Sequence, residues 1–304
     1  MFELFKKTDI DFIGKRYFFF TVSGLLVLLG VVALVQISRG KANLGIDFAG
    51  GAAVQLKFSQ PVKIDDARKA LEQGGLKDAE LQTVVEESRL LIRLKKQDIV
   101  QSNVREKIQE VFRKGFPGND FVVESSTEIG PTIGQQLQKD ALFAVTISMI
   151  GIIIYIAYRF EFRYGIAAAI ATFHDVLVVL GIFYIMNKEV TLLIITALLT
   201  IAGYSLSDTV VVFDRIRENL KTRRKESLDQ VINHSINQVL TRTFNTSLTT
   251  FLAVTALFFF GGEVIHDFAF TMLIGIIVGT YSSWFIASPL LLVRHSEARV
   301  LKRA

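Results

Sequence analysis

The chain has 304 residues, 51% of them hydrophobic, and a mean hydropathy of +0.42, which is too apolar for an ordinary soluble domain. It contains no cysteine, which excludes disulfides, thiolate metal sites and cysteine nucleophiles. The net charge is +5, but Arg39 to Glu128 carries 15 Lys/Arg against 14 Asp/Glu, so no nucleic-acid-binding surface is indicated there.

Six apolar runs are long enough to cross a bilayer, which takes roughly 20 residues. They cover about residues 17–37, 141–158, 164–186, 190–213, 243–261 and 268–293. The first run is longer than the apolar region of a signal peptide and lacks a small-residue cleavage pattern, so we expect an uncleaved anchor.

Lys and Arg in the short segments between the runs indicate the orientation. They gather on one side, at Lys6, Lys7, Lys15, Arg16, Arg159, Arg163, Arg215, Arg217, Lys221, Arg223, Arg224, Lys225, Arg294, Arg299, Lys302 and Arg303. The short segments on the other side offer only Lys188. We therefore predict a multi-pass protein of the cell (inner) membrane, with both termini cytoplasmic.

Residues 39–138, between the first two runs, mix strand and helix periodicities. Strands are expected at 51–58, 80–87, 89–95 and 121–129, and helices at 64–73 and along the face of Val100, Val104, Ile108, Val111 and Phe112. The order βαββαβ is ferredoxin-like. The predicted fold is a membrane all-α six-helix bundle, formed by 1–38 and 139–304, plus an α+β ferredoxin-like exported (periplasmic) domain.

A cytoplasmic loop at 214–240 is expected to contain a helix. Ser227 and Gln230 fit a capping box, and an apolar stripe follows at Leu228, Val231, Ile232, Ile236, Val239 and Leu240. Two interpretations stay open: an amphipathic helix lying along the inner membrane surface, or an ordinary connecting helix.

One carboxylate, Asp208, lies inside the fourth run, about 9 Å from its cytoplasmic end. A bare carboxylate costs several kcal/mol in hydrocarbon. Arg242 enters the antiparallel fifth run at a similar depth, so the two side chains are within reach of each other. A proton relay is the favoured function, in which Asp208 titrates and Arg242 tunes it. The alternative is a fixed ion pair that locks helix packing.

Further polar residues extend this pair into a polar seam: His174, Asp175, Tyr204, Ser205, Ser207, Thr246 and Thr249. We expect them to carry hydrogen bonds, with helix packing as the alternative role. His174 and Asp175 point about 100° apart on a helix, so they are not expected to serve one partner equally. No second histidine lies near His174, so no metal site is expected.

The last run contains Gly275 and Gly279 in a G-x-x-x-G pattern, which suits close helix approach. The chain lacks G-x-x-x-x-G-K-[ST], G-x-S-x-G and H-E-x-x-H, so ATP is not indicated as the energy source. We expect neither an enzyme nor a cofactor.

Long motifs at ordered positions carry a family resemblance: GIDFAGG, FHD, GYSLSDTVVVFDRIREN, LTRTFNTSLTT and GTYSSWFIASP. Together they resemble the SecF family of bacterial protein export, within the RND superfamily. The resemblance implies a SecD-like partner, a twelve-helix core beside the SecYEG channel, proton-driven assistance to a translocating unfolded polypeptide, and YajC and YidC as further candidate partners. It also implies that Asp208 and Arg242 are the family's intramembrane acid and Arg. Ser207 stands where that pattern has Asn.

Two other functions remain open from the sequence. The chain can be half of an RND-type small-molecule or lipid exporter, although an exported domain of about 100 residues leaves little room for a binding cleft. It can also be a passive scaffold of the translocation machinery, surrounded by membrane lipid. In that case the charge of Asp208 would be dispensable.

Overall fold

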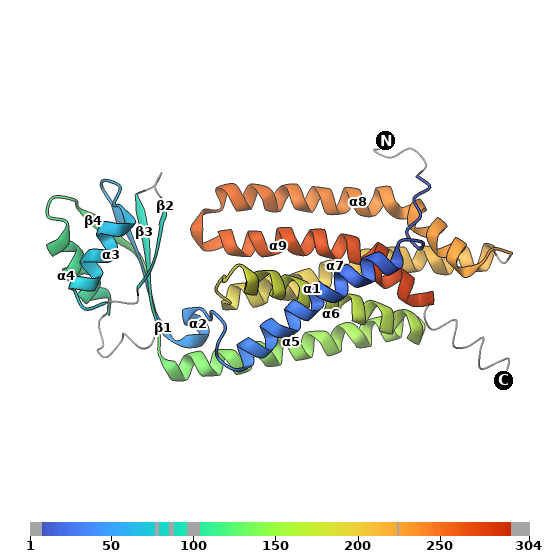
Figure 1. Ribbon diagram of the computed structural model, residues 1–304, viewed down its shortest axis with the longest axis horizontal. Coiled ribbons are helices and arrows are strands. Elements are labelled where there is room, and N and C mark those ends of the chain that lie inside the picture. Colours follow the sequence, from blue (N-terminus) through green and yellow to red (C-terminus); the bar gives the residue numbers. More distant parts are fainter. Residues whose placement is uncertain (1–7, 77–78, 85–87, 96–103, 224, 293–304) are drawn as a thin grey trace. The chain divides into compact units, whose positions relative to one another are not determined.

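The computed structural model describes residues 8–76, 79–84, 88–95, 104–223 and 225–292 (Figure 1). Two compact units divide the chain: a helical one with Met1–Asn43, Ala144–Lys188 and Leu193–Ala304, and an α+β one with Leu44–Phe143 and Glu189–Leu192. Some predictions lie outside the described residues, namely those for Lys6, Lys7, Val100, Arg224, Arg294, Arg299, Lys302 and Arg303.

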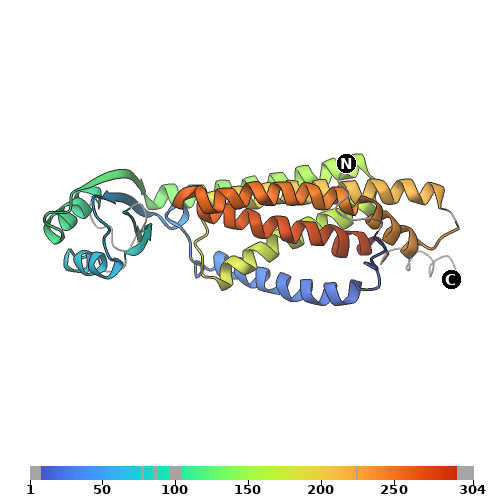
Figure 2. The same cartoon turned by 90° about the horizontal axis from the view of Figure 1, so that it is seen from above.

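In the described part of the chain six helices are long and apolar enough to cross a membrane, as predicted (Figures 1 and 2). They are α1 (Arg16–Ser38), α5 (Pro131–Arg159), α6 (Phe162–Ile185), α7 (Leu192–Thr222), α8 (Leu228–Phe260) and α9 (Gly262–Ser282). A short π-helical segment, η3 (Ser283–Ala287), continues α9. In both views α8 and α9 run side by side as a hairpin.

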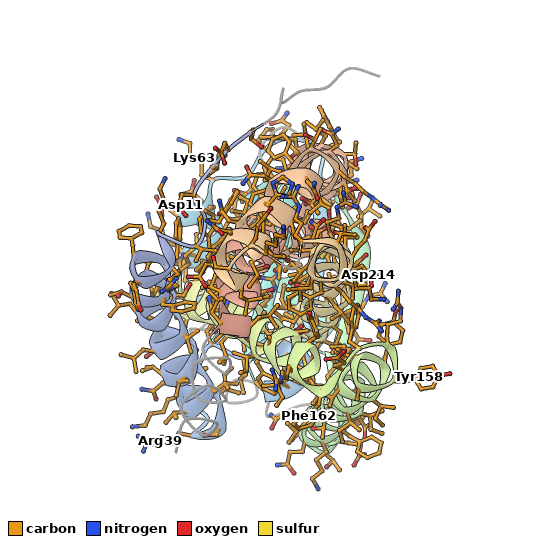
Figure 3. All side chains as sticks on the ribbon, turned by 90° about the vertical axis from the view of Figure 1, so that its right-hand side faces the viewer. Asp11, Arg39, Lys63, Tyr158, Phe162 and Asp214 are labelled. Carbon is orange, nitrogen blue, oxygen red and sulfur yellow. The ribbon has the colours of Figure 1, made fainter. Side chains whose placement is uncertain are left out.

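The helices differ in how far this chain encloses them. Of the most apolar window of α6, 61% is buried, against 17% for α1, α5 and α8. Tyr158 on α5 is 93% exposed and projects from the edge of the bundle (Figure 3). Large apolar side chains of this kind suit contact with lipid or with another membrane protein. The helices α6, α7 and α9 therefore supply the interior of the bundle.

The segment 214–240 differs from one of its two interpretations. Ser227 caps the start of α8 and forms the predicted capping box with Gln230, but α8 then runs without interruption to Phe260. Of its apolar stripe, Ile232 and Ile236 are fully buried in a core shared with Ile216 of α7, whereas Leu228 and Val239 are partly buried. The extension of α7 covers this part of the stripe, which favours the connecting helix over a helix lying on the membrane surface.

The α+β unit has the predicted ferredoxin-like topology. Its sheet, in the order β2-β3-β1-β4, is antiparallel throughout. The elements are β1 (Gly51–Phe58), α3 (Ile64–Gln73), β2 (Glu80–Val84), β3 (Arg89–Lys95), α4 (Val104–Gly115) and β4 (Phe121–Ile129). Both helices cover the same face of the sheet (Figure 1). Two split βαβ connections produce this arrangement.

Successive side chains of each strand point to opposite faces of the sheet, and those on one face form the core of this unit. Leu56 and Ile92 on the central strands are fully buried beside Phe112 of α4. On the opposite face Glu124 accepts a hydrogen bond from Gln55 at 3.0 Å and pairs with Arg89 at 2.8 Å. One sheet face is therefore dry and the other polar, as expected for an antiparallel sheet covered on one side.

A short helix before β1, α2 (Ile46–Ala49), was not predicted. The glycine pair that follows it explains the GIDFAGG motif. Gly50 has φ +74°, and a Cβ on Gly51 would lie 2.3 Å from the backbone oxygen of Leu94. Glycine alone adopts such a backbone without strain and allows so close an approach. This part of the motif is therefore structural.

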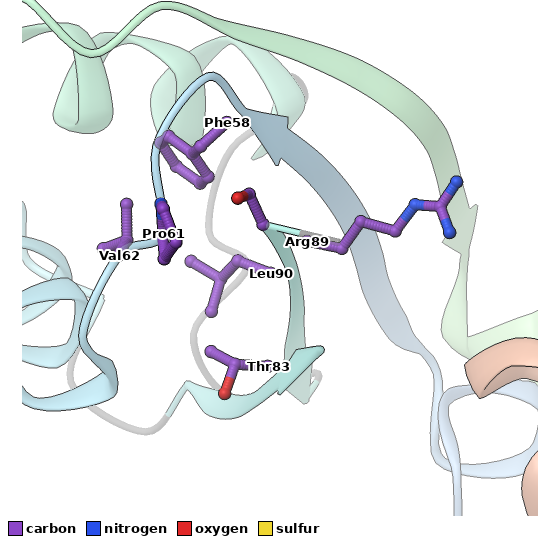
Figure 4. Close-up of a pocket in the computed structure, with 7 residues that line it drawn as sticks. Phe58, Pro61, Val62, Thr83, Arg89 and Leu90 are labelled. Atoms are coloured by element: carbon purple, nitrogen blue, oxygen red, sulfur yellow. The ribbon is translucent and has the colours of Figure 1, made fainter. Parts of the chain in front are cut away.

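The α+β unit has a shallow hollow where the end of β1 meets the β2–β3 hairpin (Figure 4). Phe58, Pro61 and Leu90 line it, while the guanidinium of Arg89 points away from it. Its volume of about 10 Å³ holds roughly one water molecule. It is too small to be a ligand site.

Residues 40–138 should fold as a soluble fragment with a cooperative thermal transition, because the unit has its own core. Within that fragment Phe112→Ala should lower the free energy of unfolding by about 3–5 kcal/mol, since the side chain is fully buried. Val122→Ala is the matched control, at a position 69% exposed, and should change it by less than about 0.5 kcal/mol. Urea melts followed by circular dichroism measure both. Equal effects, or a wild-type fragment without a cooperative transition, would contradict a self-contained domain.

Candidate intramembrane polar site

Asp208 lies on α7 and faces the interior of the bundle, with 5% of the residue exposed. Its Oδ2 accepts a hydrogen bond from Ser247 Oγ of α8 at 3.0 Å. Ser247 in turn accepts one from Thr280 Oγ1 of α9 at 2.8 Å. A short chain of hydroxyls from two neighbouring helices thus reaches the carboxylate.

Arg242 is not brought to Asp208. Within the described residues Asp208 makes no ion pair, and Arg242 is exposed on α8. The face of α8 that meets α7 carries Thr243 and Ser247, which are buried. Arg242 precedes Thr243, so its side chain points about 100° away from that face.

Thr246 and Thr249 share the exposed face of Arg242. Their hydroxyls donate to backbone carbonyls of their own helix, Thr246 to Arg242 at 3.0 Å and Thr249 to Thr246 at 2.9 Å. The sequence therefore located a polar helix correctly but assigned the wrong face of it to the contact with Asp208. A shift of one residue rotates a helical side chain by enough to cause this.

Asp175 on α6 is fully buried and is the centre of a second polar cluster. His174 Nδ1 is hydrogen-bonded to its Oδ1 at 2.8 Å. Its Oδ2 accepts hydrogen bonds from Ser205 of α7 and, at 2.9 Å, from Ser282 of α9. His174 Nε2 contacts the hydroxyl of Tyr281 at 3.0 Å. The two adjacent α6 residues therefore contact each other as well as separate partners.

The remaining predicted seam residues divide between the interior and the outside of the chain. Ser205 joins the Asp175 cluster, as described. Ser207 is exposed on α7. Tyr204 is half-buried, and its hydroxyl has no hydrogen-bond partner in the described part of the chain.

Sequence reasoning missed several hydroxyls that complete the site. They are Ser23, Thr209, Ser247, Thr280, Tyr281, Ser282 and Ser283. The polar run Thr280–Ser283 follows the apolar stretch 272–279, and that change was the available signal. Which helix each hydroxyl faces depends on packing and could not be read from the run.

The glycines of α9 allow this helix to lie against α7. A Cβ on Gly275 would come within 2.2 Å of the Ile201 side chain, and one on Gly279 within 2.9 Å of Ser205 Cβ. Directly after them η3 forms a π-helical turn, and Ser288 Oγ donates to the carbonyl of Ser283 at 2.8 Å. Such turns occur often at functional sites. The close approach brings Ser282 of α9 to Asp175, and Thr280 of α9 to Ser247, the hydrogen-bond partner of Asp208.

The chemistry available here is proton binding and transfer. Hydroxyls both donate and accept hydrogen bonds, and a carboxylate without a cation nearby can take up a proton. Among the residues that the structure describes, no group of three or more His, Asp or Glu side chains is placed to hold a metal ion.

Comparisons with known proteins agree with this architecture. Residues 107–297 match the family model "Protein export membrane protein SecD/SecF, C-terminal", and residues 41–62 match the SecD/SecF GG motif. The protein translocase subunit SecF of Thermodesulfovibrio yellowstonii is 53% identical over 96% of this chain and 97% of its own length. SecF of Endomicrobium trichonymphae is 44% identical over 95% and 92%.

Solved structures give the same result for the fold. The crystal structure of SecDF, described as a translocon-associated membrane protein from Thermus thermophilus, superposes with a TM-score of 0.83 and 36% identity over 95% of this chain. A second SecDF structure, in a super-membrane-facing form, gives a TM-score of 0.71 and 34% identity. This chain spans 39% and 41% of those two SecDF chains. The resemblance deduced from the sequence motifs is confirmed, and the chain belongs to the SecF family, the multi-pass membrane subunits of protein translocase.

Proposed function

We propose that this chain couples proton flow across the cytoplasmic membrane to the export of unfolded polypeptides, as the SecF-type half of a complex with a SecD-type subunit. The observation that carries the proposal is Asp208, a buried carboxylate on a membrane-spanning helix, whose hydrogen-bond partner in the described part of the chain is the hydroxyl of Ser247. Intramembrane acids of this kind are expensive and typically serve ion or proton pathways. Asp208 is the proposed proton carrier.

The exposed polar face of α8 supports the proposal of a partner subunit. Arg242, Thr246 and Thr249 are exposed on it in this chain, and an Arg facing hydrocarbon costs at least about 2.5 kcal/mol. A second membrane protein with polar groups on its matching face would remove that cost. The solved relatives are named SecDF, so a SecD-type subunit is the proposed occupant. Arg242 then acts at the subunit interface, tuning the proton pathway from there.

The wider assembly and the orientation are parts of the same proposal. Basic residues at the α5–α6 and α7–α8 turns support placing these turns in the cytoplasm, with both termini on that side. The α+β unit then lies outside the cytoplasmic membrane, where it meets the exported polypeptide. The SecYEG channel is the proposed neighbour, with YajC and YidC as further candidates. The chain itself is proposed to catalyse no covalent reaction.

A small-molecule exporter is less well supported. Such a function needs a cleft of a few hundred Å³. The hollow beside Phe58 and Leu90 has a volume of about 10 Å³ and supplies no such cleft in that part of the α+β unit. A polypeptide substrate is proposed because the relatives of this chain are protein translocase subunits.

The test is export of a secretory precursor into inverted membrane vesicles that contain or lack this chain. A proton gradient should stimulate export in vesicles that contain the chain, and this stimulation should be lost without it. An uncoupler added to the complete vesicles should reproduce the loss. Equal stimulation in both kinds of vesicle would contradict the proposal.

The chain should also co-purify with a SecD-type protein from native membranes, because the polar face of α8 needs cover. Quantitative mass spectrometry of the purified complex measures the ratio of the two subunits, which should be near one to one. Monodisperse chain that conducts protons without any partner would contradict the pairing.

A further inference from the structure

A polar cluster separate from Asp208 joins four helices in the interior of the bundle. Beyond the contacts of Asp175 with His174, Ser205 and Ser282, the hydroxyl of Tyr281 lies 2.6 Å from Ser23 Oγ on α1. Hydrogen bonds thus run from Asp175 through His174 and Tyr281 to the first helix. None of these residues takes part in the hydrogen bonds of Asp208.

The side chains around Asp175 include one base, His174. Asp175 is fully buried, and its two carboxylate oxygens have three hydrogen-bond partners, His174, Ser205 and Ser282. No Lys or Arg of the described chain contacts the cluster. Of the other titratable groups on the helices packed here, Tyr281 on α9 contacts His174, and Asp208 lies one turn beyond Ser205 on α7. Among the described residues, His174 is therefore the only side chain in contact with Asp175 that can become a cation.

Protonation of His174 would reverse the direction of the hydrogen-bond chain. With neutral His174, Nδ1–H donates to Asp175, and Nε2 accepts the hydroxyl proton of Tyr281, whose oxygen then accepts from Ser23. When a proton from water adds to Nε2, that nitrogen becomes a donor. The oxygen of Tyr281 must then accept from His174, and its hydroxyl donates to Ser23. Both geometries fit the same heavy-atom distances.

Two glycines hold α1 in place for this contact. Gly30 and Gly181 each lie seven residues beyond a member of the chain, Ser23 on α1 and His174 on α6, and so on the same faces. A Cβ on Gly30 would be 2.1 Å from the backbone oxygen of Leu177, and one on Gly181 would be 2.8 Å from the nitrogen of Gly30. The two helices touch backbone to backbone, and Ser23 is held at a buried position beside Tyr281.

We propose that His174 and Asp175 form a second proton-binding site, separate from Asp208, and that Tyr281 and Ser23 transmit the charge of His174 to helix α1. In this arrangement His174 and Asp175 bind the proton, and Tyr281 is the relay between α6, α9 and α1. Because proton binding is measured directly, the proposal does not depend on precursor export.

The test is nuclear magnetic resonance of the full chain with its SecD-type partner in lipid nanodiscs, labelled with ¹⁵N in histidine and ¹³Cζ in tyrosine. His174→Gln and Tyr281→Phe assign the two signals. Between about pH 8 and pH 5 the ring of His174 should change from one N–H to two. The Cζ signal of Tyr281 should shift over the same interval, because its hydroxyl changes from donor to acceptor in the hydrogen bond with His174.

Variants separate the proposed parts. Asp175→Asn should keep His174 neutral over the interval, because the cation loses its carboxylate. Tyr184→Phe, a matched control at the end of the same helix, should leave both signals unchanged. The titration should also persist in Asp208→Asn, whatever that variant does to export.

Three results would overturn the proposal. The first is a His174 ring that keeps one protonation state in the wild type, a measurement that needs no variant. The second is a Tyr281 Cζ signal that does not shift while His174 titrates. The third is loss of the titration in Asp208→Asn, which would mean one shared site. Retention of the SecD-type partner on purification shows that each variant is folded.

Discussion

Asp208→Asn should abolish the stimulation of precursor export by a proton gradient while leaving the chain assembled with its SecD-type partner. Asn keeps the size of the side chain, and its carbonyl can still accept the hydrogen bond from Ser247. It cannot take up and release a proton. Inverted vesicles with and without a gradient measure the stimulation, which should fall to the level seen with an uncoupler.

The chain supplies a matched control on the same helix. Asp214 is about 42% exposed and pairs with Arg159 at 3.0 Å. Because an exposed pair is worth only about 0–1 kcal/mol, Asp214→Asn should leave export close to that of the wild type. Asp208→Glu should keep partial function, and Arg242→Lys should give an intermediate defect, because Lys retains the charge but not the planar fork. Full stimulation in Asp208→Asn would eliminate the relay and leave a scaffold role.

Gly30→Ala should destabilise the bundle strongly although it adds only one methyl group. The new Cβ would lie 2.1 Å from the oxygen of Leu177, a backbone atom that cannot move aside without displacing α1 from α6. Overpacking of this kind costs about 1–3 kcal/mol or more. We expect a lower temperature of thermal aggregation in detergent and less folded protein in the membrane.

Gly24→Ala on the same helix is the matched control, since no heavy atom lies within 4 Å of its added Cβ. It should be neutral or slightly stabilising, because Ala forms helix better than Gly by up to about 1 kcal/mol. The difference between the two variants isolates the steric term from helix propensity. Equal thermal stability of Gly24→Ala and Gly30→Ala would show that α1 and α6 do not meet as described.

Local patterns in the sequence were enough for the fold class and for most of the elements. The strands 51–58, 89–95 and 121–129 and the helix 64–73 have the predicted bounds, because a period of two or of 3.6 with turn residues at the ends depends only on neighbouring residues. Six spans follow from length and hydropathy alone. The capping box at Ser227 was likewise readable, since both of its hydrogen bonds are local.

The partners of the polar side chains were decided by tertiary packing. Asp208 could be recognised as an intramembrane acid from its position. Its contact with Ser247 in place of Arg242 depends on how α8 is rotated about its own axis, because successive side chains of a helix point about 100° apart. The close contact of Gly30 with Gly181 and the path from Ser23 to Asp175 join residues more than a hundred positions apart. The position of each polar residue along its helix could be read from the sequence, because composition and the helical rise are local properties. Only the tertiary structure decided which of them meet, because helix rotation and crossing result from the packing of all the helices at once.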